Sequence, residues 1–132
     1  MLDLATLEGL ARARLEDAQA LIDASRYDGA VYICGYALEL ALKHRICTSL
    51  AWTGFPETRA EFQGYNSLKT HDLDVLLRFS GVEAAIKGQR HADWSTAVAW
   101  DPEARYRQAG TAGETEARQL LGAVETLLGV LL

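Results

Sequence analysis

Cationic and aromatic side chains gather in one part of the sequence, residues 87–107. The group consists of Lys87, Arg90, His91, Arg105, Tyr106 and Arg107. Arginine binds phosphate through paired N–H donors, and an aromatic ring can stack on a nucleic-acid base. These residues are therefore the candidate nucleotide- or RNA-binding set, with Trp94 and Trp100 beside them. A salt-bridged surface is the alternative, because residues 81–110 hold four Lys and Arg against four Asp and Glu.

Histidine exchanges protons near neutral pH, so His71 and His91 are the candidate catalytic residues. Arg105 is the candidate cation that would act beside them. His71 lies at the predicted start of a short helix, where its ring could contact a base or a nucleotide. The alternative is structural: the ring would cap backbone groups, or pack against Tyr27 or Tyr32.

Glu39 is a lone acid in the middle of an apolar helical segment. An unpaired carboxylate would be costly there. Lys43 lies four residues further on, which predicts an ion pair within the helix; a cation from another helix would serve equally. Burial would make Glu39 a positioned group. The cluster Lys43-His44-Arg45 is interpreted as solvated charge at a helix end.

No metal or cofactor is predicted. The three histidines are far apart, and neither a His-x3-His nor a His-x2-Glu spacing occurs. No Ser or Cys lies in a nucleophile motif. Cys34 and Cys47 are 13 residues apart in one predicted helix, too far for a disulfide. We expect both thiols to pack in the core.

Helices must position these side chains, because apolar residues recur at helical spacing. The predicted long helices cover residues 4–24, 26–50 and about 111–130, and shorter ones cover about 72–79, 83–87 and 93–99, with a helical turn from Pro102. Two capping boxes are expected, Ser25 with Asp28 and Thr111 with Glu114. The sequence predicts an all-α fold: an antiparallel up-down helical bundle of about four to five main helices, with short helical pieces in the middle.

Composition limits the classes of protein further. A chain of 132 residues fits one domain with a real core. The net charge of −5 disfavours nonspecific adhesion to nucleic acid, so an anion-binding surface must be local. The longest apolar run, Ala30–Leu38, is shorter than the roughly 20 residues of a membrane span. Asp3 and Glu8 precede any basic residue, unlike a signal peptide. We expect a cytoplasmic protein without membrane contact.

Three segments occur in an order typical of one family. They are Arg26-Tyr27-Asp28-Gly29-Ala30, Ala37-Leu38-Glu39-Leu40-Ala41-Leu42-Lys43, and Lys69-Thr70-His71-Asp72-Leu73. The motif positions within them are Arg26, Tyr27, Asp28, Glu39, Lys43, His71 and Asp72. Together with the later segment 100–106, they resemble the HEPN family of small helical domains.

The resemblance implies one HEPN-like domain over residues 1–132, frequent homodimers and a role around nucleotides or RNA. Many members are metal-free RNases in which each chain of a dimer supplies an Arg-x(4–6)-His motif. Other members are partners of a nucleotidyltransferase, often in toxin–antitoxin or defence pairs, and some bind without catalysis.

This chain departs from the RNase pattern. Eleven residues separate Arg59 from His71, twelve separate Arg78 from His91, and no Arg-x(4–6)-His spacing occurs. We therefore expect a binding or partner module for nucleotide or RNA rather than an enzyme. Two alternatives stay open. One is a divergent RNase that uses His91 or His71 with Arg105 or Arg90, and the other is a purely structural dimerisation domain.

Overall fold

The computed structural model describes the backbone of residues 1–132 and all side chains except those of Ala104 and Arg105. Its helices are α1 (Leu4–Asp23), α2 (Tyr27–Leu50), α3 (Leu73–Phe79), α4 (Glu83–Gln89), α5 (His91–Val98) and α6 (Glu114–Leu131). Short 3-10 helices form at η1 (Asn66–Leu68) and η2 (Pro102–Tyr106). The predicted all-α bundle is confirmed. One small feature was not predicted, the antiparallel pair of β1 (Leu2–Asp3) and β2 (Gly54–Phe55).

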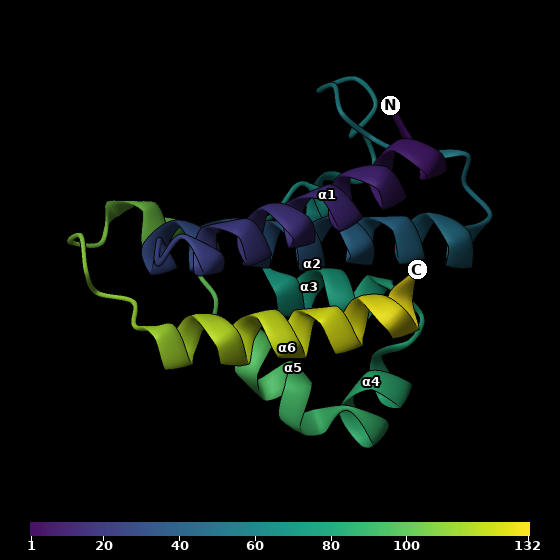
Figure 1. Ribbon diagram of the computed structural model, residues 1–132. Coiled ribbons are helices and arrows are strands. Elements are labelled where there is room, and N and C mark those ends of the chain that lie inside the picture. The colour runs from purple at the N-terminus through teal and green to yellow at the C-terminus, as the bar shows by residue number, and fades with distance from the viewer.

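Helix α2 is the centre of the bundle. Helices α1, α3 and α6 all pack against it, and α5 packs against α6 (Figure 1). Its side chains Leu38, Leu42 and Ile46 are fully enclosed, and each such burial contributes roughly 1.5–3 kcal/mol. A helix covered on several sides needs little polar surface, which explains its apolar sequence. None of the described helices combines the length and apolar character of a membrane span.

The two long helices after the first do not begin as predicted. Ser25 is no N-cap: it adopts a left-handed backbone with φ 59°, and the cap residue is Arg26, without a side-chain hydrogen bond. Thr111 is no cap either, since Gly113 precedes α6 and the Thr111 hydroxyl donates to the Gln108 carbonyl. Both capping boxes are therefore wrong, although the helices themselves are in place.

The basic residues Lys43, His44 and Arg45 of α2 are half-buried rather than solvated at a helix end. The helix continues to Leu50, and Arg45 reaches across to donate from Nη2 to the Val130 carbonyl at 2.9 Å. That carbonyl belongs to the last turn of α6 and has no partner within the helix. The interpretation of residues 43–45 as solvated charge is thus wrong. Cys34 and Cys47 are buried free thiols, as predicted, and burial raises their pKa values to about 12 and about 11.

Candidate functional site

A buried carboxylate on α2 is the base of the candidate site. The Glu39 residue is 2% exposed. Its Oε1 accepts a hydrogen bond from Lys43 Nζ at 2.9 Å and lies 2.8 Å from His71 Nδ1. The predicted ion pair with Lys43 is therefore confirmed, and His71 joins the same oxygen from a distant part of the chain. Glu39 Oε2 has no hydrogen-bond partner among the described atoms.

The segment before α3 holds His71 in place. Asp72 is the N-cap of α3, and its Oδ1 accepts from the backbone N–H groups of Asp74 and Val75 at 3.0 and 3.2 Å. The Thr70 hydroxyl in turn accepts from the Asp72 N–H at 3.0 Å. A capped helix start fixes the direction in which the chain enters. The capping role considered for His71 thus belongs to Asp72, and His71 is free to reach Glu39.

Aromatic rings form the wall behind His71. The Tyr36 ring meets the imidazole edge-to-face at 6.0 Å and the Trp100 indole at 5.0 Å. The packing of His71 on Tyr27 or Tyr32 that we considered is replaced by Tyr36. Trp100 can lie this close to α2 because Gly35 has no side chain. A Cβ at Gly35 would come within 1.9 Å of the indole.

The His71 side chain is 58% exposed although its partner Glu39 is buried. With Nδ1 directed at a carboxylate, the imidazole is held in one orientation and Nε2 is left for a ligand or a proton. This arrangement of carboxylate and histidine is the one that orients a general base. In its protonated form, the same imidazole can donate its Nε2–H to a phosphate oxygen while Nδ1–H stays on Glu39.

His71 separates two pockets of different charge. One, of about 550 Å³, is lined by Asp72, Asp74, Trp100 and Asp101, and we call it the acidic pocket. The other, of about 470 Å³, is lined by Lys43, Lys69 and Glu57 among apolar residues, and we call it the basic pocket. His71 lines both.

The lysines of the basic pocket rest on aromatic rings. Lys43 Nζ lies 5.2 Å from the centre of the Phe55 ring, and Lys69 Nζ lies 6.0 Å from that of Phe62. Such cation–π contacts hold a charge in position at a modest energetic gain. We refer to Glu39, Lys43, Lys69 and His71 together as the His71 site.

Three family-motif residues lie elsewhere. Arg26, Tyr27 and Asp28 line a separate pocket at the start of α2. The Asp28 carboxylate accepts from the backbone N–H groups of Gly110 and Ala112, at 2.6 and 2.8 Å. These two hydrogen bonds lower the pKa of Asp28. Asp28 therefore anchors the segment before α6.

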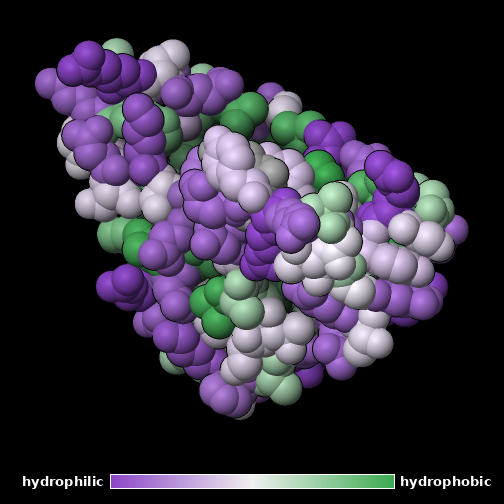
Figure 2. All heavy atoms as spheres, turned by 90° about the vertical axis from the view of Figure 1, so that its left-hand side faces the viewer, coloured by the Kyte–Doolittle hydropathy of each residue, from purple (hydrophilic) through white to green (hydrophobic). Residues whose placement is uncertain are grey.

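The predicted cationic set is divided between two parts of the bundle. Lys87, Arg90 and His91 lie on or between α4 and α5, whereas Tyr106 and Arg107 follow at the end of η2. Figure 1 shows α4 and η2 at opposite ends of the molecule. The Arg105 side chain lies outside the described residues. The face of the molecule nearest η2 is mostly hydrophilic, with small separate apolar areas (Figure 2).

Local ion pairs engage part of this set. Lys87 Nζ lies 3.3 Å from Glu83, and Arg107 Nη1 lies 3.7 Å from Glu116. The side chains concerned are 38–49% exposed, where such pairs are worth little. Among the members of the set whose side chains are described, none lines either pocket beside His71. The geometry here favours the alternative of a salt-bridged surface.

Two contributors to the site were missed in the sequence. Tyr36 lies three residues before Glu39, so that both project from one side of α2; the helical spacing was a usable signal. Lys69 lies two residues before His71 within a segment already singled out, but nothing local shows that it rests on Phe62. Within the described residues, no group of three or more His, Cys, Asp and Glu is placed to hold a metal ion.

Comparisons of the chain with protein-family models, with curated proteins and with solved structures gave no match. The resemblance to the HEPN family therefore stays a prediction. Function has to be inferred from the geometry around His71.

Proposed function

We propose that this chain is a small HEPN-like binding module that holds a phosphate of a nucleotide or of RNA at the His71 site. The observation that carries the proposal is the 2.8 Å contact between His71 Nδ1 and the buried Glu39 carboxylate. It orients an exposed imidazole toward a pocket that Lys43 and Lys69 also line. A phosphate there would meet two ammonium groups and one ring N–H.

The difference in charge between the two pockets beside His71 determines which end of the ligand each pocket would bind. The ion pair with Glu39 neutralises much of the charge of Lys43. Lys69 and His71 are therefore the main anion-binding groups of the basic pocket. The three aspartates of the acidic pocket repel phosphate. We therefore expect a bound phosphate on the Lys69 side of the imidazole and the attached base or sugar on its Trp100 side.

The wider setting of the module is part of the same proposal. It acts in the cytoplasm, as a homodimer or as the partner of a nucleotidyltransferase in a toxin–antitoxin or defence pair. The joint order of the family motifs in the sequence supports the homodimer and the nucleotidyltransferase partner. A gene for a nucleotidyltransferase beside that of this chain, and co-purification of the two products, is the observation expected.

Binding to a labelled single-stranded RNA and to labelled ATP at low salt tests the proposal. Measured by fluorescence anisotropy, the double variant Lys69→Ala, His71→Ala should bind at least about tenfold more weakly, because charge-assisted hydrogen bonds contribute about 1.5–3 kcal/mol. The matched control Lys87→Ala, Arg90→Ala also removes two groups that can carry positive charge, but away from His71. It should change binding less than about threefold. Equal losses in both variants, or no binding by the wild type, would contradict the proposal.

A divergent RNase is the second candidate function, and the Glu39–His71 pair favours His71 over His91 as its base. A carboxylate-oriented imidazole could take the proton from a ribose 2′-hydroxyl as that oxygen bonds to the adjacent phosphorus. The bond from phosphorus to the 5′-oxygen then breaks, and the leaving 5′-oxygen takes a proton from solvent. RNA cleavage by the wild type that persists undiminished in a His71→Ala, His91→Ala double variant would exclude this candidate.

A further inference from the structure

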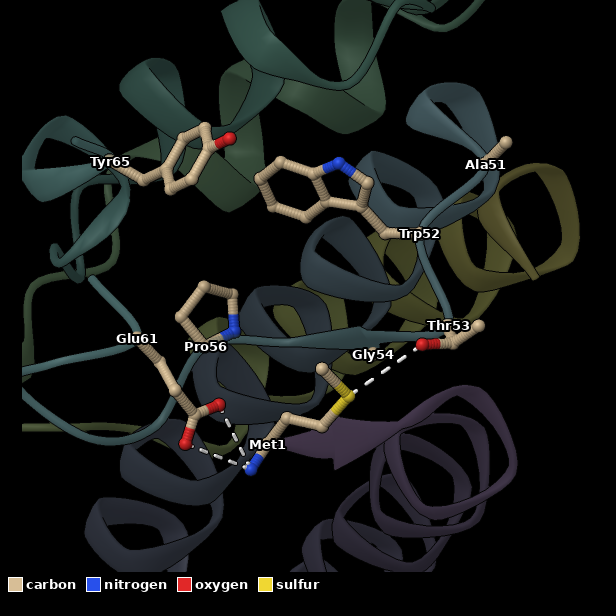
Figure 3. A pocket seen from close by; sticks show the side chains of 8 residues that line it. All are labelled: Met1, Ala51, Trp52, Thr53, Gly54, Pro56, Glu61 and Tyr65. Atoms are coloured by element: carbon tan, nitrogen blue, oxygen red, sulfur yellow. Dashed lines mark hydrogen bonds and ion pairs between the residues drawn. The ribbon is translucent and has the colours of Figure 1, made fainter. Parts of the chain in front are cut away.

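A further pocket, of about 430 Å³, opens between the end of α2 and β2 (Figure 3). We call it the terminal pocket. Its walls are mainly the side chains of Met1, Trp52, Pro56 and Tyr65, with the Glu61 carboxylate at one edge. The residues of the His71 site do not line it, so its ligand is a separate question from the function proposed above.

The aromatic part of the terminal pocket is an open corner. The Trp52 and Tyr65 rings have centroids 5.0 Å apart and planes at 75°. Ala51, the residue after α2, adopts a left-handed conformation with φ 56°. The backbone N–H of Trp52 donates back to the Cys47 carbonyl at 2.8 Å, which fixes the position of the Trp52 backbone from which the indole projects. Tyr65 is 49% exposed. An aromatic ring this exposed beside a pocket is a surface available to a ligand.

Glu61 at the edge of the pocket and Glu57 of the adjoining basic pocket together bind one ammonium group. The Met1 amino group lies 2.8 Å from Glu57 Oε2 and 3.0 Å from Glu61 Oε2. One ammonium against two carboxylates leaves the edge with a net negative charge. The contact with this amino group is the main reason why the pKa of Glu61 is lowered, so Glu61 remains a carboxylate at neutral pH.

We infer that the terminal pocket binds an alkylammonium group, with its methyl or methylene groups against Trp52 and Tyr65 and its charge toward Glu61. Ring faces attract cations through their quadrupole, and aromatic corners with an acid nearby suit methylated ammonium groups. A neutral apolar ligand would fill the same space without using the carboxylate. The alkylammonium group and the neutral ligand would occupy the same space and differ only in charge.

A pair of isosteres separates these occupants. Choline carries a quaternary nitrogen where 3,3-dimethylbutan-1-ol has a carbon, so the two differ in charge and hardly in shape. In titrations of the full chain followed by the NMR signals of the Trp52 indole, choline should bind about tenfold more tightly than the alcohol. Equal affinity for the two, or no shift of Trp52 with choline, would overturn the inference.

Variants locate the binding. Trp52→Leu and Tyr65→Leu should each weaken choline binding. Because Trp52→Leu lacks the indole, choline binding to this variant is followed by the NMR signals of Tyr65. Glu61→Gln should weaken it about fivefold while leaving the alcohol unaffected. Phe79→Leu removes another exposed ring, outside the pocket, and should bind choline like the wild type. The Tyr65 and Glu61 variants decide the matter if Trp52→Leu does not fold.

A trimethyllysine peptide that binds more tightly than choline would show that the group comes from a protein side chain; equal affinity would indicate a free small molecule.

Discussion

The His71 site can be compared with a second surface, which we call the α4–α5 surface and which consists of Glu83, Lys87, Arg90 and His91. The two carry similar side chains in opposite surroundings. Both have a histidine near a lysine that pairs with a glutamate four residues away. At the His71 site, the Lys43 and Glu39 side chains are 17% and 3% exposed. On α4, the Lys87 and Glu83 side chains are 48% and 38% exposed. The same local pattern is thus a buried anchor in one place and a solvated pair in the other.

What distinguishes the two regions is a contact across the fold. His71 reaches Glu39 over 32 positions of sequence, and Tyr36 and Trp100 close the site from two further elements. No such long-range bond to His91 is found among the described residues. A histidine supported by a buried carboxylate is held in one orientation, whereas one exposed on a short helix is not. The predictions below change one region and its counterpart in parallel.

The largest difference is expected at two glycines. Gly35→Ala should destabilise the fold by about 3 kcal/mol, because the new Cβ would displace the Trp100 indole from α2. Gly88→Ala on α4 meets open space and should stabilise by about 0.5–1 kcal/mol through helix propensity. Urea unfolding followed by circular dichroism measures both. A neutral Gly35→Ala would mean that Trp100 does not pack against α2.

The second difference concerns the two ion pairs. Glu39→Ala should cost about 2 kcal/mol, because it leaves Lys43 largely buried without its partner. The cost stays below that of a fully buried pair since the Lys43 side chain retains some contact with water. Glu83→Ala should change the free energy of unfolding by less than about 0.5 kcal/mol. Similar costs for the two, measured by the same unfolding experiment, would contradict the contrast in burial.

The third prediction concerns the pH dependence of stability that comes from Asp28, which anchors the segment before α6. The pKa of Asp28 is lowered by the backbone N–H groups of Ala112 and Gly110. Its contribution to stability is therefore complete above its ordinary value of 3.8 and is lost as the pH falls through the lower folded-state pKa. Wild type should lose more stability on acidification below about pH 4 than Asp28→Asn. Thermal unfolding of both proteins between pH 6 and pH 2.5 tests this, and parallel curves would contradict it.

Local signals sufficed for the helices and failed at the site for a physical reason. The apolar spacing of α2 and the four-residue step from Glu39 to Lys43 are properties of one helix, and both were predicted. The Ser25 capping box failed because tertiary contacts outweighed it: Asp28 binds Gly110 and Ala112 rather than Ser25. The Thr111 box failed because local contacts engage both of its residues: Thr111 donates to the Gln108 carbonyl, and Glu114 pairs with Arg118. The site itself depends on which elements meet. The contact of His71 with Glu39 depends on how the segment before α3 packs against α2. The division of the cationic set between α4 and η2 depends likewise on how the helices are arranged in the bundle.

The His71 site can be compared with the α4–α5 surface in a single sample. Histidine imidazole signals in NMR report separately on His44, His71 and His91 while adenosine monophosphate is added at constant pH and low salt. The account predicts that the signals of His71 shift and saturate while those of His91 stay in place, and that the shift is lost in Lys69→Ala. Saturable shifts at His91 with His71 unchanged would place the phosphate on α4 and α5 and contradict the central claim.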